Sequence, residues 1–344
     1  MTKVLKSIKK IYVVLILGLF FSIVYAVSIG AVGIKFNVVF AIILDWLGFE
    51  VPVIWSEGWQ VIILVIRLPR VLMAVVIGAM LGVAGVAAQG LFKNPIADPY
   101  IIGISSAAGF GTALMVVLDM SFFSLLTIPL VAFLFAILSV TIVYKIAQTN
   151  YRMSTSALIL SGIAVSFFFS ALTSFILFFS EDKAHNILSY LMGSLWGVSW
   201  IKFYIVLAVM IPCIITLFFY GGDLNLMVFS DEAAQSMGVN IEQSKSVILV
   251  LMTLLTATAV AFCGTIGFIG LIIPHMMRLL VGSNNRKLMI LSAFGGGLLL
   301  LWADLLSRTL ISPLEIPVGI FTALMGGPFF LYLIFQKKKS GELG

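Results

Sequence analysis

The stretch VIILVIRLPRVLMAVVIGAMLGVAGVAAQ, residues 61–89, decides the fold of this chain. Apart from Arg67, Arg70 and Gln89 it consists of apolar residues, glycines and one proline, and it exceeds the roughly 20 residues with which an α-helix crosses the hydrocarbon core of a bilayer. A membrane-spanning β-strand would need only about ten residues of alternating polarity. The stretch therefore predicts a spanning helix, which pairs its own backbone groups where no water is available.

The composition of the whole chain supports the same class of protein. Of its 344 residues, 62% are hydrophobic and only 10% are charged, whereas a soluble domain carries roughly 25% charged residues. So few charges cannot cover the surface of a water-soluble protein of this length. Because further apolar runs follow one another without a long polar linker, we expect one membrane domain over residues 1–344 with an all-α fold.

The apolar runs predict about ten spanning helices. They cover residues 11–31, 61–89, 98–118, 123–147, 155–179, 200–220, 245–263, 266–281, 288–306 and 316–335. The lysines that precede the first run resemble the start of a secretory signal. That run is nevertheless long enough to span the bilayer, so we expect an uncleaved first helix.

The net charge of +6 bears on orientation. The basic residues lie in short loops and tails, where they set the sidedness of a membrane protein, so we do not expect nucleic-acid binding. With ten spans, both termini lie on one side, and most lysines and arginines fall on that side. The bias predicts that both termini are cytoplasmic.

Three glycines in the quoted stretch have the spacing of a helix-packing face. Gly78, Gly82 and Gly85 follow one another at intervals of four and three residues. Small residues let helix backbones approach closely in lipid, where no hydrophobic effect drives helices together. The pattern predicts a tight helical bundle and identifies no substrate.

The polar segment 223–244 interrupts the apolar pattern. Ser230 is a good N-cap, Asp231 and Glu232 then favour the positive end of a helix dipole, and Gly238 is placed to end the helix. The segment predicts a capped helix of about two turns, which is marginal alone and needs a surface to pack on. It is either a solvated loop that packs on its own domain or a docking element for a cytoplasmic partner.

Charged residues at the predicted outer ends of two spans leave two interpretations open. Arg67, Arg70 and Arg308 either extend their side chains to the membrane interface or form a basic rim that binds carboxylates of an external partner. Asp304 precedes Arg308 by four residues, so the two can pair on one helix face. The pairing makes a structural salt bridge the favoured role of Asp304, with an isolated proton-relay carboxylate as the alternative.

No pattern in the sequence indicates covalent chemistry or a metal site. Cys213 and Cys263 lie inside apolar runs, and we expect neither a disulfide nor a metal role for them. His275 follows Pro274 in an apolar span and is interpreted as a packing residue. The sequence has no phosphate-binding loop of the pattern G-x-x-x-x-G-K-[ST], so another chain must bind any nucleotide that drives this protein.

Several long motifs resemble a known family. Residues 67–105 contain RLPR, GAMLGVAG, QGLFKNPIADP and IGIS, residues 264–278 read GTIGFIGLIIPHMMR, and residues 303–319 contain AD and EIPVG. These segments are similar to the iron-siderophore, haem and vitamin B12 permeases, the FecCD-type subunits of type II ABC importers. The resemblance runs from about residue 12 to residue 335, and the segment SDEA at 230–233 with Gly238 fits the coupling segment of that family.

The resemblance implies a BtuC-like fold and an assembly in a bacterial cytoplasmic membrane. Two permease subunits, identical or paralogous, would form the pathway, two ATPase subunits would use ATP and Mg²⁺, and a substrate-binding protein would dock outside. The permease would translocate an iron-siderophore complex by alternating access, without a catalytic site and without a cofactor or metal of its own. Haem and cobalamin are the alternative cargoes.

The resemblance also implies roles for individual residues. The positions that match coupling to the ATPase are Ser230, Asp231, Glu232, Ala233, Gln235, Ser236 and Gly238. Arg67, Arg70 and Arg308 match positions that dock the binding protein. Asn94 and Ile96 match one cytoplasmic gate, and Ser154, Thr155 and Ser156 match the other.

Two other classes of protein remain as alternatives. An ion-coupled secondary transporter usually keeps carboxylates or broken helices near the bilayer midplane, whereas Asp304 lies near a predicted membrane end. A membrane-embedded enzyme would need a convergent polar site, and the sequence indicates none. The capped helix at Ser230–Gly238 favours an importer that works with a cytoplasmic ATPase.

Overall fold

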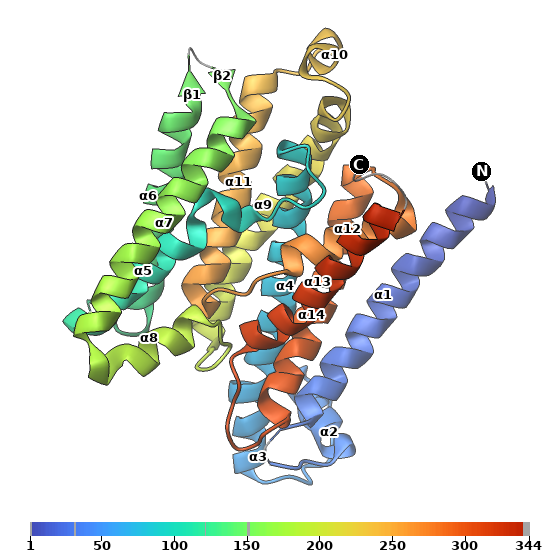
Figure 1. The fold of residues 1–344 in the computed structure, drawn as a ribbon. Helices are drawn as coiled ribbons and strands as arrows, with labels where there is room; N and C mark the ends of the chain where they lie inside the picture. The colour runs from blue at the N-terminus through green and yellow to red at the C-terminus, as the bar shows by residue number, and fades with distance from the viewer. Residues whose placement is uncertain (1, 31, 121, 150–151, 340–344) are drawn as a thin grey trace.

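The computed structural model describes residues 2–30, 32–120, 122–149 and 152–339, and these residues are almost entirely helical (Figure 1). The α-helices are α1 (Thr2–Ser28), α2 (Phe36–Trp46), α3 (Glu57–Val61), α4 (Leu68–Leu91), α5 (Ile104–Leu118), α6 (Thr127–Ala147), α7 (Thr155–Phe179), α8 (Ala184–Leu191), α9 (Trp200–Met227), α10 (Asp231–Ser236), α11 (Ile241–Cys263), α12 (Ile269–Val281), α13 (Asn285–Thr309) and α14 (Val318–Lys339). A π-helix, η1 (Ile62–Arg67), joins α3 to α4, and short 3₁₀ turns occur at η2 (Pro99–Ile102), η3 (Ser124–Leu126) and η4 (Glu181–Lys183). Strands β1 (Gln148–Thr149) and β2 (Arg152–Met153) form a small antiparallel pair.

The long helices run side by side and give the molecule two ends (Figure 1). One end, called the α10 end below, carries α10, the β1–β2 pair, the start of α1 and the end of α14. The opposite end, called the α2 end, carries α2, α3 and α8. The start of α1 and the end of α14 therefore lie at the same end of the bundle.

The predicted all-α fold with about ten spanning helices is confirmed, because a helix lies at each predicted span. Among the described residues, seven helical segments are long and apolar enough to cross a membrane, and α5, α12 and α14 are the shorter apolar helices at the other predicted spans. Helix α7 has the predicted bounds, whereas α9 continues seven residues beyond its predicted end at residue 220. Ala31, the predicted end of the first span, lies outside the described residues.

The quoted stretch forms one continuous helical segment with a local change of winding. Pro69 has no backbone N–H, and its ring crowds the carbonyl four residues earlier. The preceding turns adopt π winding, in which Leu68 donates its N–H to the oxygen of Ile63, five residues back. Single π turns of this kind are rare and often lie at functional sites. Here the π turn ends at Arg67, whose side chain is buried.

Helix α4 is the centre of the bundle and touches its neighbours backbone to backbone. A methyl group on Gly78 would overlap the carbonyl of Gly296 in α13, and one on Gly85 would overlap the carbonyl of Gly270 in α12. These contacts confirm the prediction of a tight bundle from the glycine spacing. They leave no room for a larger side chain at either position.

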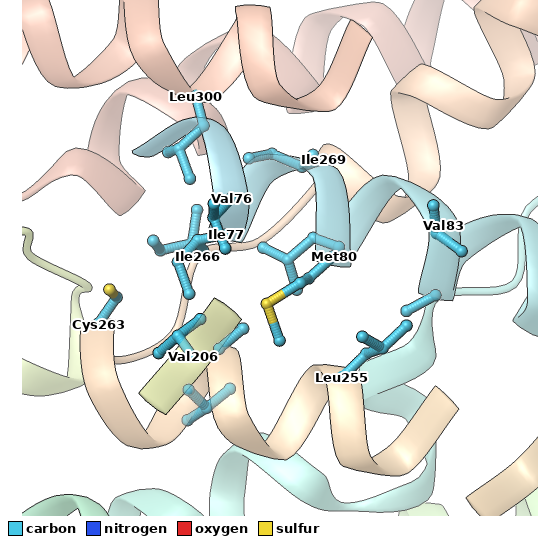
Figure 2. Packing of buried hydrophobic residues seen from close by; sticks show 14 of the residues in the cluster. Val76, Ile77, Met80, Val83, Val206, Leu255, Cys263, Ile266, Ile269 and Leu300 are labelled. Atoms are coloured by element: carbon cyan, nitrogen blue, oxygen red, sulfur yellow. The ribbon is translucent and has the colours of Figure 1, made fainter. Parts of the chain in front are cut away.

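Apolar side chains from five segments fill the space around α4 (Figure 2). Val76, Ile77, Met80 and Val83 of α4 meet side chains from α9, α11, α12 with its preceding turn, and α13. The labelled partners are Val206, Leu255, Cys263, Ile266, Ile269 and Leu300. Cys263 lies in this apolar cluster and is 2% exposed.

Candidate functional site

Helix α10 has the capped geometry that its sequence predicts. The Ser230 hydroxyl accepts a hydrogen bond from the Ala233 N–H at 2.9 Å, and Asp231 and Glu232 occupy the first turn. Gly238 adopts a left-handed φ of +89° after the helix, and the Val239 N–H closes the end on the Ala234 oxygen. The predicted short helix is confirmed, together with both of its end signals.

The inner face of α10 packs on the protein's own helices. Ala234 is fully buried and contacts Met227 at the end of α9 and Ile241 at the start of α11. Leu226 and Val239 complete this small apolar cluster. The segment is therefore a helix seated on the bundle, and its outer face is available to a partner.

The outer face of the segment carries apolar side chains beside polar ones. Phe229 is 83% exposed, Met237 is 67% exposed and Val228 is 50% exposed, while Glu232 and Gln235 are exposed between them along the chain. Sequence reasoning missed the three apolar residues. They could have been identified from the sequence, because several large apolar side chains within one polar segment indicate a surface that contacts another element or protein.

Asp231 is held between two lysines from different helices. Its Oδ1 accepts from Lys93 Nζ at 2.8 Å, just beyond α4, and its Oδ2 accepts from Lys245 Nζ of α11 at 2.6 Å. Burial alone would raise the pKa of Asp231, but the hydrogen bonds and charges of Lys245 and Lys93 outweigh it and lower the pKa below its ordinary value. The ion triad joins α10 to α4 and α11.

The two predicted gate segments also lie at the α10 end. Asn94 lies in the turn after α4, where its side-chain oxygen accepts from the Ile96 N–H at 3.1 Å, and Ile96 is 45% exposed. Ser154 caps α7 by accepting from the Ala157 N–H, and Thr155 and Ser156 follow in the first turn of α7. Their gating role stays a prediction.

Each gate segment is bonded to the segment around α10. The first is reached through Lys93, which immediately precedes Asn94 and pairs with Asp231. The second is reached through Glu242 of α11, whose Oε2 accepts from the Met153 N–H at 2.8 Å. Sequence reasoning missed Lys93 and Glu242, because neither contact follows from spacing along the chain.

At the α2 end, Arg70 joins two carboxylates. Its Nε and Nη2 each lie 2.9 Å from Asp304 Oδ1, and its Nη1 lies 2.8 Å from Glu315 Oε1. Arg308 Nε approaches Asp304 Oδ2 at 3.5 Å, which confirms the predicted Asp304–Arg308 ion pair. Because Asp304 is fully buried between two guanidinium groups, the structure favours the salt-bridge interpretation over a free proton-relay carboxylate.

The predicted exposed basic rim is not what the structure shows. Arg67, Arg70 and Arg308 are only 5%, 8% and 7% exposed. Arg67 donates to the carbonyls of Val27 and Ser28 at 3.1 Å, and Arg308 donates to a carbonyl of the same α1 end. The last carbonyls of a helix need partners and attract cations, so Arg67 and Arg308 hold α1 in place. Docking of an external protein here stays a prediction.

The described residues contain no group of three or more His, Cys, Asp and Glu side chains that could hold a metal ion. His275 of α12 instead stacks its ring edge-on against Phe329 of α14, with ring centroids 6.2 Å apart. Two groups of charged side chains stand out among the described residues, the ion triad at the α10 end and the arginine–carboxylate network at the α2 end.

Residues 16–336 match the model of the FecCD transport family. The chain is 39% identical to the hemin transport system permease protein HmuU of Yersinia pestis, over 80% of this chain and 83% of that protein. It is 39% identical to the cobalamin import system permease protein BtuC of Halobacterium salinarum, over 85% and 77%. It is 36% identical to the Fe(3+) dicitrate transport system permease protein FecD of Escherichia coli, over 84% and 92%.

A solved structure has the same fold along nearly the whole chain. It shows an inward-facing conformation of a transporter assigned to the metal-chelate type of ABC transporter. The TM-score is 0.82 and the identity is 32%, with 95% of this chain and 99% of that chain covered. The family resemblance read from the motifs is thus confirmed at the level of both sequence and fold.

Proposed function

We propose a function on the premise that this chain belongs to the FecCD transport family and is a permease of the ABC importer type. Such a permease is not a catalyst, and ATP is hydrolysed by a separate subunit. The finer proposal is that the chain translocates an iron-siderophore complex across a bacterial cytoplasmic membrane by alternating access. ATP and Mg²⁺ would be held by the ATPase, with no cofactor on this chain.

The outer face of α10 carries the proposal for the ATPase contact. Phe229 and Met237 expose large apolar surfaces, and exposed Glu232 adds a charge beside them. Buried aromatic anchors within a polar rim are typical of binding hot spots between proteins. Because the inner face of α10 already packs on α9 and α11, force applied to the outer face would reach the spanning helices.

The distribution of charge supports a cytoplasmic location for the α10 end. Lys93, Lys145, Lys245, Arg286 and Lys287 lie at or near this end, together with the lysine-rich segments at the start of α1 and the end of α14. Cytoplasmic loops of membrane proteins carry such an excess of lysine and arginine. The α10 end would then face the ATPase and the α2 end a binding protein.

The transport cycle follows from population shifts. A second permease subunit, identical or paralogous, would complete the pathway, with two ATPase subunits beneath it. ATP drives transport only if ATP and the loaded binding protein favour different states of the assembly. At the α2 end, a carboxylate of the binding protein would reach Arg70 by displacing Glu315, whose side chain is 36% exposed.

The proposal for the transported cargo rests on the relatives of this chain. The relatives named above carry hemin, cobalamin and Fe(3+) dicitrate, and the solved structure is of the metal-chelate type. An iron-siderophore complex is ranked first, with haem and cobalamin as alternatives. Uptake of ⁵⁵Fe bound to a hydroxamate siderophore, in competition with hemin and with cobalamin, tests this order. The iron-siderophore proposal would be replaced if hemin or cobalamin is taken up and the siderophore complex is not.

The ATPase contact is tested with the variant Phe229→Ser in the purified assembly. Loss of a hot-spot aromatic typically costs about 2 kcal/mol or more, so the affinity for the ATPase should fall at least about thirtyfold. Phe122→Ser is the matched control, since Phe122 is 67% exposed but lies in the turn between α5 and α6 at the α2 end. Equal affinities of the two variants, or a wild-type chain that associates with no ATPase, would contradict the proposal.

A further inference from the structure

Lys93 occupies a backbone position that usually belongs to glycine. Helix α4 ends in a two-bond motif, in which the Asn94 N–H bonds to the Gln89 oxygen and the Lys93 N–H to the Gly90 oxygen. In this motif the first residue beyond the helix end, here Lys93, must adopt a left-handed conformation, and that residue is most often glycine. Lys93 adopts this conformation with φ of +50°, which costs energy for a residue with a side chain.

The side chain of Lys93 spans the gap to α10. Its Nζ lies 2.8 Å from Asp231 Oδ1, and both side chains are about one-third exposed, at 36% and 35%. Lys245 binds the other oxygen of Asp231 and is only 6% exposed. The two lysines therefore differ: Lys245 anchors α10 from within the bundle, and Lys93 links it to the turn after α4.

Stability does not account for a lysine at this position. An ion pair between flexible side chains that are one-third exposed contributes little to folding, whereas glycine would relieve the left-handed backbone. Backbone strain persists where the surrounding structure imposes it, and it is often found at switch regions. We therefore attribute the presence of lysine at position 93 to its ion pair with Asp231.

We propose that the Lys93–Asp231 ion pair transmits movement of α10 to the turn at residues 93–98, which makes Lys93 a positioning residue for coupled transport. Lys93 is the first residue of this turn, and Asn94 and the exposed Ile96 follow it directly. A displacement of Asp231 thus acts on the turn through one side chain. The inference rests on the proposed function, in which α10 is moved by the ATPase.

The variant Lys93→Gly distinguishes a residue that transmits movement of α10 from one that only stabilises the folded structure. Glycine relieves the backbone strain and removes the link, so the thermal midpoint of the assembled transporter should be equal to or above that of the parent. Movement of the turn should nevertheless be lost. Lys93→Arg keeps a charge-assisted bond to Asp231 and should retain movement, and Lys287→Ala, at an exposed lysine of the same end, is the matched control.

The movement is measured at Ile96→Cys in the assembly of permease and ATPase in lipid nanodiscs. Cys213 and Cys263 are buried, so a maleimide would report chiefly on position 96. Between the nucleotide-free and the vanadate-trapped states, its modification rate should change by about fivefold or more in the parent, in Lys93→Arg and in the Lys287→Ala control. The same rate should change by less than about twofold in Lys93→Gly, in which the link is absent.

Two outcomes overturn the inference. One is a full change of the modification rate in Lys93→Gly. The other is loss of the change in modification rate in Lys93→Gly together with a lowered thermal midpoint, since that combination indicates that Lys93 only stabilises the structure. Failure of the proposed function itself would show separately, because the parent with Lys93 would then assemble with no ATPase and hydrolyse no ATP.

Discussion

Replacing Asp304 by asparagine tests whether the network at the α2 end stabilises the bundle. The Asp304 side chain is fully buried, and it faces Arg70 at 2.9 Å and Arg308 at 3.5 Å. Asp304→Asn keeps the shape but removes the charge, and its amide nitrogen would face a guanidinium group. Arg70 would keep Glu315, whereas Arg308 would keep only its bond to a carbonyl of α1.

The magnitude follows from burial. Removing one partner of a buried ion pair costs about 3–5 kcal/mol, because the remaining charge stays desolvated and unpaired. Glu315→Gln is the matched comparison, since it removes a carboxylate from the same Arg70 but at a side chain that is 36% exposed. Pairs near the surface contribute about 0–1 kcal/mol. The two variants should therefore differ by about 2–5 kcal/mol.

Unfolding of the purified permease in mixed micelles, with rising mole fraction of sodium dodecyl sulfate, measures both variants on one scale. Thermal midpoints in lipid nanodiscs provide a second measurement. The reasoning is refuted if Asp304→Asn and Glu315→Gln destabilise the protein equally. It is also refuted if Asp304→Asn leaves stability unchanged and abolishes uptake driven by a proton gradient, since Asp304 would then act as a coupling carboxylate.

Three further predictions concern other parts of the bundle. Gly78→Ala should destabilise the protein by about 1–3 kcal/mol, because the added methyl overlaps the Gly296 carbonyl and forces α4 away from α13. Gly18→Ala, with no atom within 4 Å of the new methyl, should not lower the thermal midpoint, since alanine is the better helix former. Arg67→Ala should raise hydrogen exchange in the last turn of α1, whose carbonyls lose their donor, and unchanged exchange would refute that role. The pKa of Asp231 is lowered in the folded protein. Its ion pairs are therefore present above the ordinary carboxyl pKa near 4, and they are lost as pH falls through the lower folded value. Titration of Asp231 should thus leave the affinity of the permease for the ATPase constant between about pH 5 and 8.

The spanning helices could be predicted because hydropathy is a local property. Each run of about 20 apolar residues must satisfy its backbone within itself, so residues 155–179 could be identified as a helix without any knowledge of their neighbours. Helices α2 and α8 were missed, because 11 and 8 residues are too few to span the bilayer and give no hydropathy signal of a spanning helix. The cap of α10 was found, since Ser230 and Gly238 act within one or two turns of themselves.

The polar contacts could not be predicted, because they join residues far apart in the sequence. Lys93 and Asp231 are separated by 138 positions, and Arg70 and Asp304 by 234. The arginines were interpreted as exposed because they stand at helix ends, where an outward side chain is the usual solution. Their burial depends on the end of α1 lying beside them, which only the packing of whole helices decides.

The two ends of the bundle differ in how their charges are solvated, and this difference bears on where the subunit can move. At the α2 end, separating Arg70 from Asp304 would leave desolvated charges without partners, which is costly. At the α10 end, Lys93 and Asp231 are about one-third exposed, so their charges stay partly solvated when the segments around them shift. Within one subunit, a rearrangement imposed from outside should therefore begin in the segments at the α10 end, which move together through the Lys93–Asp231 pair, before it disturbs the arginine network.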